Sequence, residues 1–217
     1  MCFSATASFT ASGVLALAGI ATLRETKQKS HIPFASIPLL FAVQQFFEGF
    51  VWLSLQHTEY AGWEAFSTTT FLIFAQVVWP IFVPLSILYM EREYKRRVVL
   101  IFLSIAGILV GGYLGTCILI YDVKAIINDF HIKYDLSFPP FNLNYNGILY
   151  FTATVIPAFV SSVKWMKYFA GAILGSFLLT EILYPSYLIS VWCFFAAILS
   201  SIIYFIIRAQ KTIDRLF

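Results

Sequence analysis

Residues 32–55 read IPFASIPLLFAVQQFFEGFVWLSL, a long apolar stretch in which Glu48 is the single charged residue. A helix of about 20 apolar residues crosses the hydrocarbon core of a bilayer, which is about 30 Å thick. The stretch therefore predicts a membrane-spanning helix. A carboxylate at that depth is costly and normally faces the protein interior, so Glu48 is the first candidate for a functional residue.

The whole chain has the composition of a membrane protein. Hydrophobic residues make up 60% of its 217 residues and charged residues 12%, and the mean hydropathy is +0.82. These values lie well outside those of soluble domains. The net charge of +3 is spread over short joints, which excludes the basic surface of a nucleic-acid-binding protein. Cys2, Cys117 and Cys193 have no C-x-x-C spacing, which argues against a disulfide framework or a zinc ribbon.

Seven apolar runs of this kind predict an all-α membrane protein with a single domain over residues 1–217. We expect helices near residues 5–23, 32–55, 67–90, 98–121, 147–163, 168–185 and 187–207. No basic residue precedes the first run, which therefore predicts a retained helix rather than a cleaved signal peptide. The long connection, residues 122–146, is expected to be an extracytoplasmic loop. Such loops cap a site or are mobile, and mobility is the favoured interpretation.

The distribution of basic residues predicts the orientation in the membrane. The joints after the first, third, fifth and seventh runs contain nearly all of them: Arg24, Lys27, Lys29, Arg92, Lys95, Arg96, Arg97, Lys164, Lys167, Arg208, Lys211 and Arg215. The opposite joints contain Lys124 and Lys133 beside several acidic residues. By the positive-inside rule, the N-terminus lies outside and the C-terminus inside, as in a multi-pass inner-membrane protein.

An internal duplication, with three helices on either side of a fourth, is one interpretation of seven spans. Glu48 in the second span and Glu181 in the sixth both lie in the outward half of a helix that runs from inside to outside. The pattern Val-Trp-x-x-Phe occurs at residues 78–82 and again at residues 191–195. Chance similarity in a chain rich in Phe and Val is the alternative. In either case we expect both carboxylates to face a common interior.

The second span also contains a polar seam. Gln44, Glu48 and Trp52 are spaced four residues apart and share one stripe of a helix, and Gln45 lies three residues before Glu48. Interhelical hydrogen bonds, worth about 1 kcal/mol in membranes, would explain the two glutamines. A carboxylate is a costly way to make such a bond. We therefore expect a polar cavity around Glu48 and Glu181, in the outward half, that binds or passes a small molecule or an ion.

Prolines inside the predicted spans are a second anomaly. Pro80 and Pro84 fall in the third span, and Pro157 falls in the fifth. Each proline frees a carbonyl from its helical hydrogen bond and kinks the helix. A freed carbonyl can line a cavity, but a packing kink is the commoner interpretation of any single proline.

Two further functions are compatible with the sequence. A membrane enzyme could use Cys2, whose amine and thiol would form a nucleophile or chelator after removal of Met1, or an outer-face metal held by Cys2, His57 and His131. Zinc is the metal that suits these ligands, although the chain has none of the His-x-x-x-His or His-Glu-x-x-His pairs typical of familiar zinc hydrolases. The other alternative is a structural or assembly subunit of a membrane complex, with Phe-rich and Trp-rich packing surfaces.

Residues 1–9, MCFSATASF, and residues 36–52, SIPLLFAVQQFFEGFVW, resemble an uncharacterised family of small bacterial polytopic membrane proteins. Its members begin Met-Cys-Phe-Ser-Ala and have a second helix with the pattern Gln-Gln-x-x-Glu-Gly-x-x-Trp. The resemblance covers the first quarter of the chain and supplies no reaction and no ligand. It implies that Cys2 belongs to one site with Gln44, Gln45, Glu48 and Trp52. We accordingly expect Cys2 or Ser4 to fold inward to that cavity.

Overall fold

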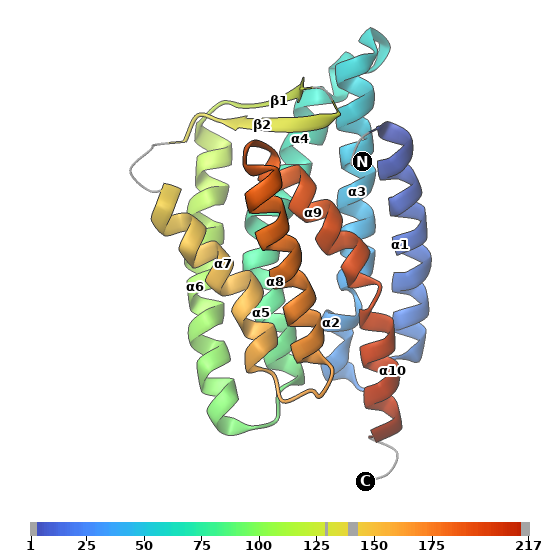
Figure 1. Ribbon diagram of the computed structural model, residues 1–217, viewed down its shortest axis with the longest axis vertical. Coiled ribbons are helices and arrows are strands. Elements are labelled where there is room, and N and C mark those ends of the chain that lie inside the picture. The colour runs from blue at the N-terminus through green and yellow to red at the C-terminus, as the bar shows by residue number, and fades with distance from the viewer. Residues whose placement is uncertain (1–3, 129, 139–142, 214–217) are drawn as a thin grey trace.

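The apolar runs form a bundle of seven helical rods in a computed structural model, which describes residues 4–128, 130–138 and 143–213 (Figure 1). The first four rods are α1 (Ala5–Glu25), α2 (Ile32–Ala35) with α3 (Ile37–Gln56), α4 (Glu64–Ile73) with α5 (Trp79–Met90), and α6 (Tyr94–Ile120). The last three are α7 (Leu143–Val160), α8 (Met166–Leu183), and α9 (Leu188–Ser200) with α10 (Ile203–Ile213). The predicted all-α class is confirmed. Short 3-10 helices lie in three joints, at Lys29–His31, Thr58–Trp63 and Pro185–Tyr187.

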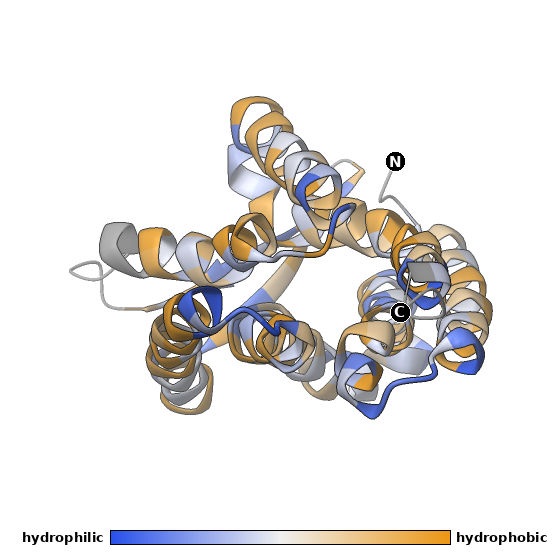
Figure 2. Ribbon diagram, turned by 90° about the horizontal axis from the view of Figure 1, so that it is seen from below, coloured by the Kyte–Doolittle hydropathy of each residue, from blue (hydrophilic) through white to orange (hydrophobic). Residues whose placement is uncertain are grey.

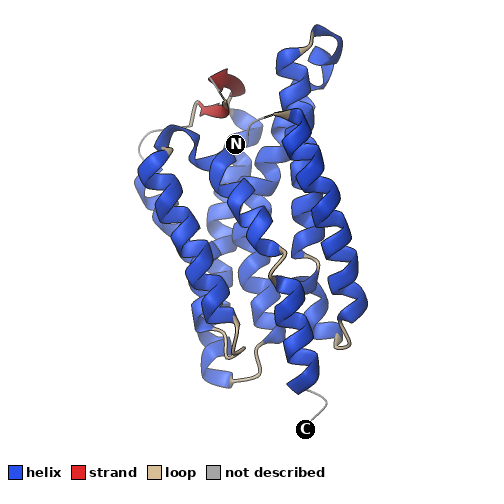
Figure 3. Cartoon of the chain, turned by 45° about the vertical axis from the view of Figure 1, so that its right-hand side comes forward, coloured by secondary structure: helices blue, strands red, loops and turns tan. Residues whose placement is uncertain are grey.

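Six of these rods, within the described residues, are long and apolar enough to cross a membrane, and α7 contributes the shorter apolar helix Gly147–Val160. Such a set is consistent with a multi-pass membrane protein. The rods stand side by side, with α7 and α9 oblique to the others (Figures 1 and 3). The joints from α1 to α2, from α5 to α6 and from α7 to α8 all lie at the lower end of Figure 1. Seen from that end, hydrophilic residues gather in the joints and apolar residues along the helices (Figure 2).

The long connection between α6 and α7 is not simply a loop, because much of it forms a β-hairpin. Strand β1 (Val123–Asn128) pairs antiparallel with β2 (His131–Leu136). Ile132 and Tyr134 are buried, and the Tyr134 ring stacks on Phe71 of α4 with centroids 4.9 Å apart. The hairpin lies across the end of the bundle opposite the basic joints (Figure 1). Residues 131–136, HIKYDL, form a strand because apolar and charged residues alternate along them, which is the pattern of a half-buried strand.

Glycines on α6 allow it to approach the third rod closely. Gly107, Gly111 and Gly115 recur every four residues and therefore share one face of the helix. A Cβ atom on Gly107 would lie 1.8 Å from the carbonyl oxygen of Pro80, so no larger residue fits there without moving a backbone. Small residues at this spacing are typical of tight helix packing in membranes.

A π-helical segment, Phe74–Val78, joins α4 to α5. The N–H of Trp79 donates to the carbonyl of Phe74, five residues earlier. Continuing this pattern would need an N–H on Pro80 to reach the Ala75 carbonyl, and proline has none. The hydroxyl of Tyr150 on α7 donates to the Ala75 oxygen instead. Because Pro80 has no N–H, the Ala75 carbonyl is left to accept a hydrogen bond from α7.

Candidate functional site

The predicted polar seam of α3 lies fully inside the bundle. Gln44, Gln45 and Glu48 are 0% exposed, and Trp52 is 1% exposed. α3 packs against α1, α4 and α9, and these side chains are shielded from solvent and lipid. A buried carboxylate with neighbouring amides needs hydrogen-bonding partners, because leaving such groups unsatisfied is costly.

Glu48 obtains one partner from α9. The hydroxyl Oγ of Ser190 donates to Oε1 of Glu48 across 2.6 Å. The other carboxylate oxygen, Oε2, has no hydrogen bond to the residues that the structure describes. One half of the carboxyl group is thus fixed by the protein, and the other half is available to another donor.

The two glutamines flank this carboxyl group. Gln44 Oε1 accepts a 2.7 Å hydrogen bond from the indole N–H of Trp79, and the Gln44 side chain also lies beside the thiol of Cys193. Gln45 lies beside Glu48 but outside good hydrogen-bonding geometry. Within the described part of the chain, both amide atoms of Gln45 and Nε2 of Gln44 lack a partner.

Other buried polar atoms without a hydrogen bond to described residues lie in the same half of the bundle, the half under the hairpin. They are Ser8 Oγ, Trp52 Nε1, Ser67 Oγ, Thr68 Oγ1, Tyr134 Oη and Trp192 Nε1. Tyr134 is within electrostatic reach of Glu48. Folded proteins contain few such atoms, and each needs an explanation such as water, an ion or a ligand. Because these atoms share one half of the bundle with Glu48, we take this region as the candidate site.

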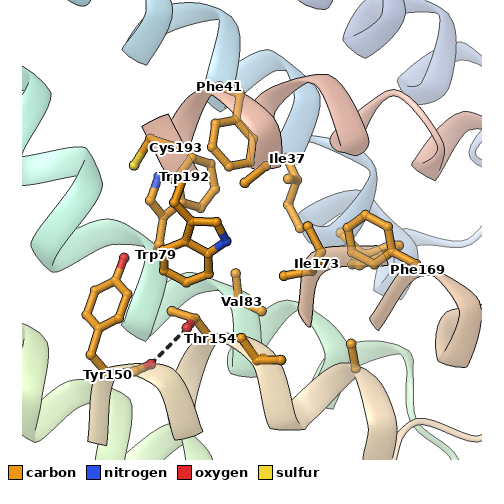
Figure 4. Close-up of a pocket in the computed structure, with 14 residues that line it drawn as sticks. Ile37, Phe41, Trp79, Val83, Tyr150, Thr154, Phe169, Ile173, Trp192 and Cys193 are labelled. Atoms are coloured by element: carbon orange, nitrogen blue, oxygen red, sulfur yellow. Dashed lines mark hydrogen bonds between the residues drawn. The ribbon is translucent and has the colours of Figure 1, made fainter. Parts of the chain in front are cut away.

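An apolar pocket of about 60 Å³ adjoins the polar atoms (Figure 4). Trp79 and Cys193 line it, and both also contact or flank Gln44. Its wall is strongly aromatic and includes Phe41, Tyr150 and Trp192. The Phe41 ring stacks on Trp79, with centroids 3.8 Å apart. The site therefore has a polar part around Glu48 and an apolar part beside it.

Glu181 does not belong to this site, and its expected place beside Glu48 is wrong. It is exposed on α8, with Ile182 and Leu183 exposed next to it. The inward position on this turn belongs to Thr180, which is buried and donates to the Ser176 carbonyl. A shift of one residue is a rotation of about 100° on a helix, which separates the two carboxylates. The positions of Glu48 and Glu181 therefore do not support an internal duplication. The two tryptophans of the repeated Val-Trp-x-x-Phe pattern, Trp79 and Trp192, do line one pocket.

The expected metal site is not assembled among the described residues. His57 is exposed, and its ring lies edge-on to that of Tyr60, with centroids 6.4 Å apart. His131 lies near Tyr184 and stacks on Tyr187, at 5.0 and 4.8 Å. No three His, Cys, Asp or Glu side chains within residues 4–128, 130–138 and 143–213 form a group that could hold a metal.

The prediction that Cys2 or Ser4 folds into the Glu48 cavity can be compared with the structure only at Ser4. Cys2 lies outside the residues that the structure describes. Ser4 is the N-cap of α1, and its hydroxyl accepts a hydrogen bond of 3.2 Å from the N–H of Ala7. This is the ordinary role of serine before a helix. Ser4 thus bonds within its own helix end, whereas the sequence predicted that Cys2 or Ser4 would fold into the cavity of Glu48.

Sequence reasoning missed a second carboxylate, at the opposite end of the bundle. Glu91 Oε1 accepts hydrogen bonds from the N–H groups of Arg92 and Glu93, at 3.0 Å, and from the Ser162 hydroxyl, at 2.7 Å. Oε2 accepts from the Ser162 N–H at 2.7 Å. Burial alone would raise the pKa of Glu91, but the hydrogen bonds from Ser162, Glu93 and Arg92 hold this pKa below its ordinary value.

Glu91 therefore ties the joint between α5 and α6 to the joint between α7 and α8. Arg96 strengthens the connection by donating to the carbonyls of Val160 and Ser161, at 2.8 and 3.1 Å. In the sequence, Glu91 is an acidic residue just after an apolar run and next to a basic cluster. This pattern is equally typical of a solvated surface residue, so it did not predict a buried contact.

One family model matches nearly the whole chain, residues 1–216, and its description is a family of unknown function (DUF6629). The match confirms the coarse expectation of an uncharacterised family. No curated protein and no solved structure matches the chain.

Proposed function

The chain belongs to this family of unknown function, and we propose that it is a multi-pass membrane protein that binds a small amphipathic molecule at Glu48. The polar head of the molecule would meet Glu48, Gln44 and Gln45. Its apolar part would enter the pocket lined by Trp79 and Trp192.

Membrane placement is supported by the outer surface of the bundle. Large apolar side chains such as Leu17, Leu119 and Ile182 are strongly exposed there, whereas soluble monomers rarely expose contiguous apolar surface on this scale. The basic joints lie together at one end (Figure 1). By the positive-inside rule that end faces the cytoplasm, and the hairpin and the N-terminus lie outside, as in an inner-membrane protein.

One observation carries the binding proposal: Glu48 Oε2 and both amide atoms of Gln45 are fully buried without a hydrogen bond to the described residues. An unsatisfied buried polar atom costs about 1–3 kcal/mol. A ligand that supplies donors would offset this cost. Because carboxylate oxygens only accept hydrogen bonds, the matching ligand head is a donor such as an amine, an ammonium group or a hydroxyl.

The aromatic wall supports the same ligand class. Trp79, Tyr150 and Trp192 line the apolar pocket next to Gln44, and aromatic rings favour apolar groups and the faces of organic cations. The hairpin packs over this end of the bundle through Tyr134 and Phe71. Passage of the molecule across the bilayer would require the hairpin to move, so binding is the function that the geometry favours.

The test is the small-molecule content of protein purified in mild detergent. Mass spectrometry of the extract should find a compound with an N–H or O–H donor and an apolar body in the wild type. Glu48→Gln should lose it, and Ala196→Phe, which fills the apolar pocket, should lose it too. Glu59→Gln, at an exposed acid, is the matched control and should retain it. The proposal is rejected if folded wild type and folded Ala196→Phe have the same content.

A further inference from the structure

A second cavity lies far from Glu48 along the bundle, at the end with the basic joints. It is a groove of about 370 Å³ between the start of α8 and α10. Its walls consist of apolar or aromatic side chains: Trp165, Tyr168, Phe169, Ile202, Phe205, Ile206 and Ala209. Ile202, in the turn just before α10, is followed at the i+3, i+4 and i+7 positions by Phe205, Ile206 and Ala209 on the helix, a spacing that places them along one side.

The groove opens to the outside of the bundle. Trp165 is 48% exposed, Tyr168 60% and Phe205 66%. Trp and Tyr are enriched where a membrane helix meets the headgroup region, because their rings are apolar and their N–H and O–H groups are polar. The groove thus contains the residue types that are typical of a membrane interface.

Basic residues lie at one end of this groove. Lys164 lies in the turn just before the start of α8, and Arg208 follows Phe205 on α10 by almost one helical turn. α8 and α10 run in opposite directions (Figure 1), so both basic residues lie at the same end. Both are exposed, and neither is in an ion pair within the described residues, where the ion pairs are Arg96–Glu93 and Lys211–Glu25.

Lys167 adds a third positive charge beside the groove. Its Nζ atom lies 5.1 Å from the centroid of the Tyr168 ring. Acidic residues also lie at this end of the bundle. Glu25 is paired with Lys211 and is within electrostatic reach of Arg208, and Glu91 already accepts hydrogen bonds from Ser162. The end of the groove is therefore positively charged, which complements an anionic group.

We propose that this groove binds one acyl chain of an anionic phospholipid, whose phosphate faces Lys164 and Arg208. Basic pockets between membrane helices on the cytoplasmic side recognise anionic headgroups, and the apolar stripe supplies the surface for the chain. The inference rests on the proposed membrane placement and not on the Glu48 ligand. The full chain reconstituted in vesicles tests it.

The measurement is quenching of tryptophan fluorescence by brominated lipids. Vesicles contain either brominated phosphatidylglycerol or brominated phosphatidylcholine in an otherwise identical unbrominated mixture. Because Trp165 lines the groove, we expect at least twofold stronger quenching by the anionic lipid. Trp165→Phe should abolish the difference. Trp63→Phe, which removes an exposed tryptophan at the opposite end, should preserve it.

Charge variants separate a site from a general surface effect. Lys164→Gln with Arg208→Gln should reduce the quenching ratio to about one. Lys27→Gln with Lys95→Gln removes the same charge from exposed positions at the same end and should leave the ratio unchanged. Equal loss in both double variants, or equal quenching by the two lipids, overturns the lipid site.

Two other results would also overturn it. Disulfide cross-linking of Phe205→Cys between two copies in the vesicles would show that the groove is an interface between chains. If the protein does not float with the vesicles, the membrane placement fails together with the lipid site. Flotation with equal quenching rejects the lipid site alone.

Discussion

The Ser190 hydroxyl donates a hydrogen bond of 2.6 Å to Oε1 of Glu48, joining α9 to α3 across 142 positions of sequence. The bond holds one carboxylate oxygen, and the other, Oε2, is buried without a hydrogen bond to the described residues. α9 therefore supplies the group that orients Glu48, whereas the sequence predicted that Glu181 on the preceding rod would share its cavity.

Ser190→Ala should weaken ligand retention without unfolding the protein. The change removes one interhelical hydrogen bond, which is worth about 1 kcal/mol in a membrane protein, and it releases the Glu48 carboxyl group. We expect a slightly lower unfolding temperature in detergent and several-fold less co-purified ligand. Ser201→Ala is the control, because the Ser201 hydroxyl bonds within its own helix to Ile198. Equal ligand content in the two variants would contradict the positioning role.

Gly107→Ala should be among the most damaging single substitutions in the bundle. Its new Cβ would lie 1.8 Å from the Pro80 carbonyl oxygen, so α5 and α6 must separate. Overpacking of this kind costs about 1–3 kcal/mol. Gly112→Ala lies on the same helix with nothing within 4 Å of the new atom, and it should be neutral or stabilising by up to about 1 kcal/mol. Thermal unfolding of both variants checks the contrast, and similar unfolding temperatures would refute it.

Tyr150→Phe should destabilise the protein through the α4–α5 junction. Its hydroxyl donates to the carbonyl of Ala75, which cannot bond to Pro80 because proline has no N–H. Loss of the hydroxyl leaves that carbonyl unsatisfied, at a cost of about 1–3 kcal/mol. Tyr94→Phe removes a hydroxyl from a strongly exposed residue and should have no effect. The comparison is made by thermal unfolding, and equal stability of the two variants would show that Ala75 finds another donor.

The sequence predicted those features that depend on local composition. The positions of the seven rods follow from apolar runs, and the burial of Gln44, Gln45 and Glu48 follows from the cost of polar groups in an apolar span. The partners of these residues could not be predicted, because they depend on which helices meet. Ser190 and Trp79, which bond Glu48 and Gln44, come from distant segments. One residue of helical rotation separates the buried Thr180 from the exposed Glu181.

The hairpin and the Glu91 contacts were missed for a different reason. Both lie in joints, where short patterns are ambiguous. HIKYDL alternates as a strand does, but two short strands gain stability only from the surface they cover, here through the stacking of Tyr134 on Phe71. Glu91 is an acidic residue beside basic ones, and only the approach of Ser162 distinguishes it from a solvated side chain.

Cysteine labelling tests the proposed orientation. In a Cys2→Ser background, Lys95→Cys should resist an impermeant thiol reagent in intact cells, whereas Glu59→Cys should react, because the basic joints are expected in the cytoplasm. Both positions are exposed, and the described native cysteines, Cys117 and Cys193, are buried. Permeabilised cells provide the control, in which both variants should react. Reversed labelling would place the Glu48 site in the cytoplasmic half.

Glu91→Gln should lower stability in a pH-dependent way. Hydrogen bonds from Ser162, Glu93 and Arg92 hold the pKa of folded Glu91 below its ordinary value of 4.5. A group whose folded-state pKa is depressed stabilises the protein above the unfolded-state pKa, and this contribution is lost as the pH falls through the folded-state pKa.

At neutral pH the substitution should therefore cost about 1.5–3 kcal/mol, the range for hydrogen bonds to a charged group. The difference from wild type should shrink as the pH falls below 4.5, because the wild-type carboxyl group then also becomes neutral. Thermal unfolding in detergent across this range measures it. Glu59→Gln, at an exposed acid outside any described ion pair, should match wild type throughout. A Glu91→Gln deficit of constant size at every pH would show that packing, and not the charged hydrogen bonds, connects the α5–α6 joint to the α7–α8 joint.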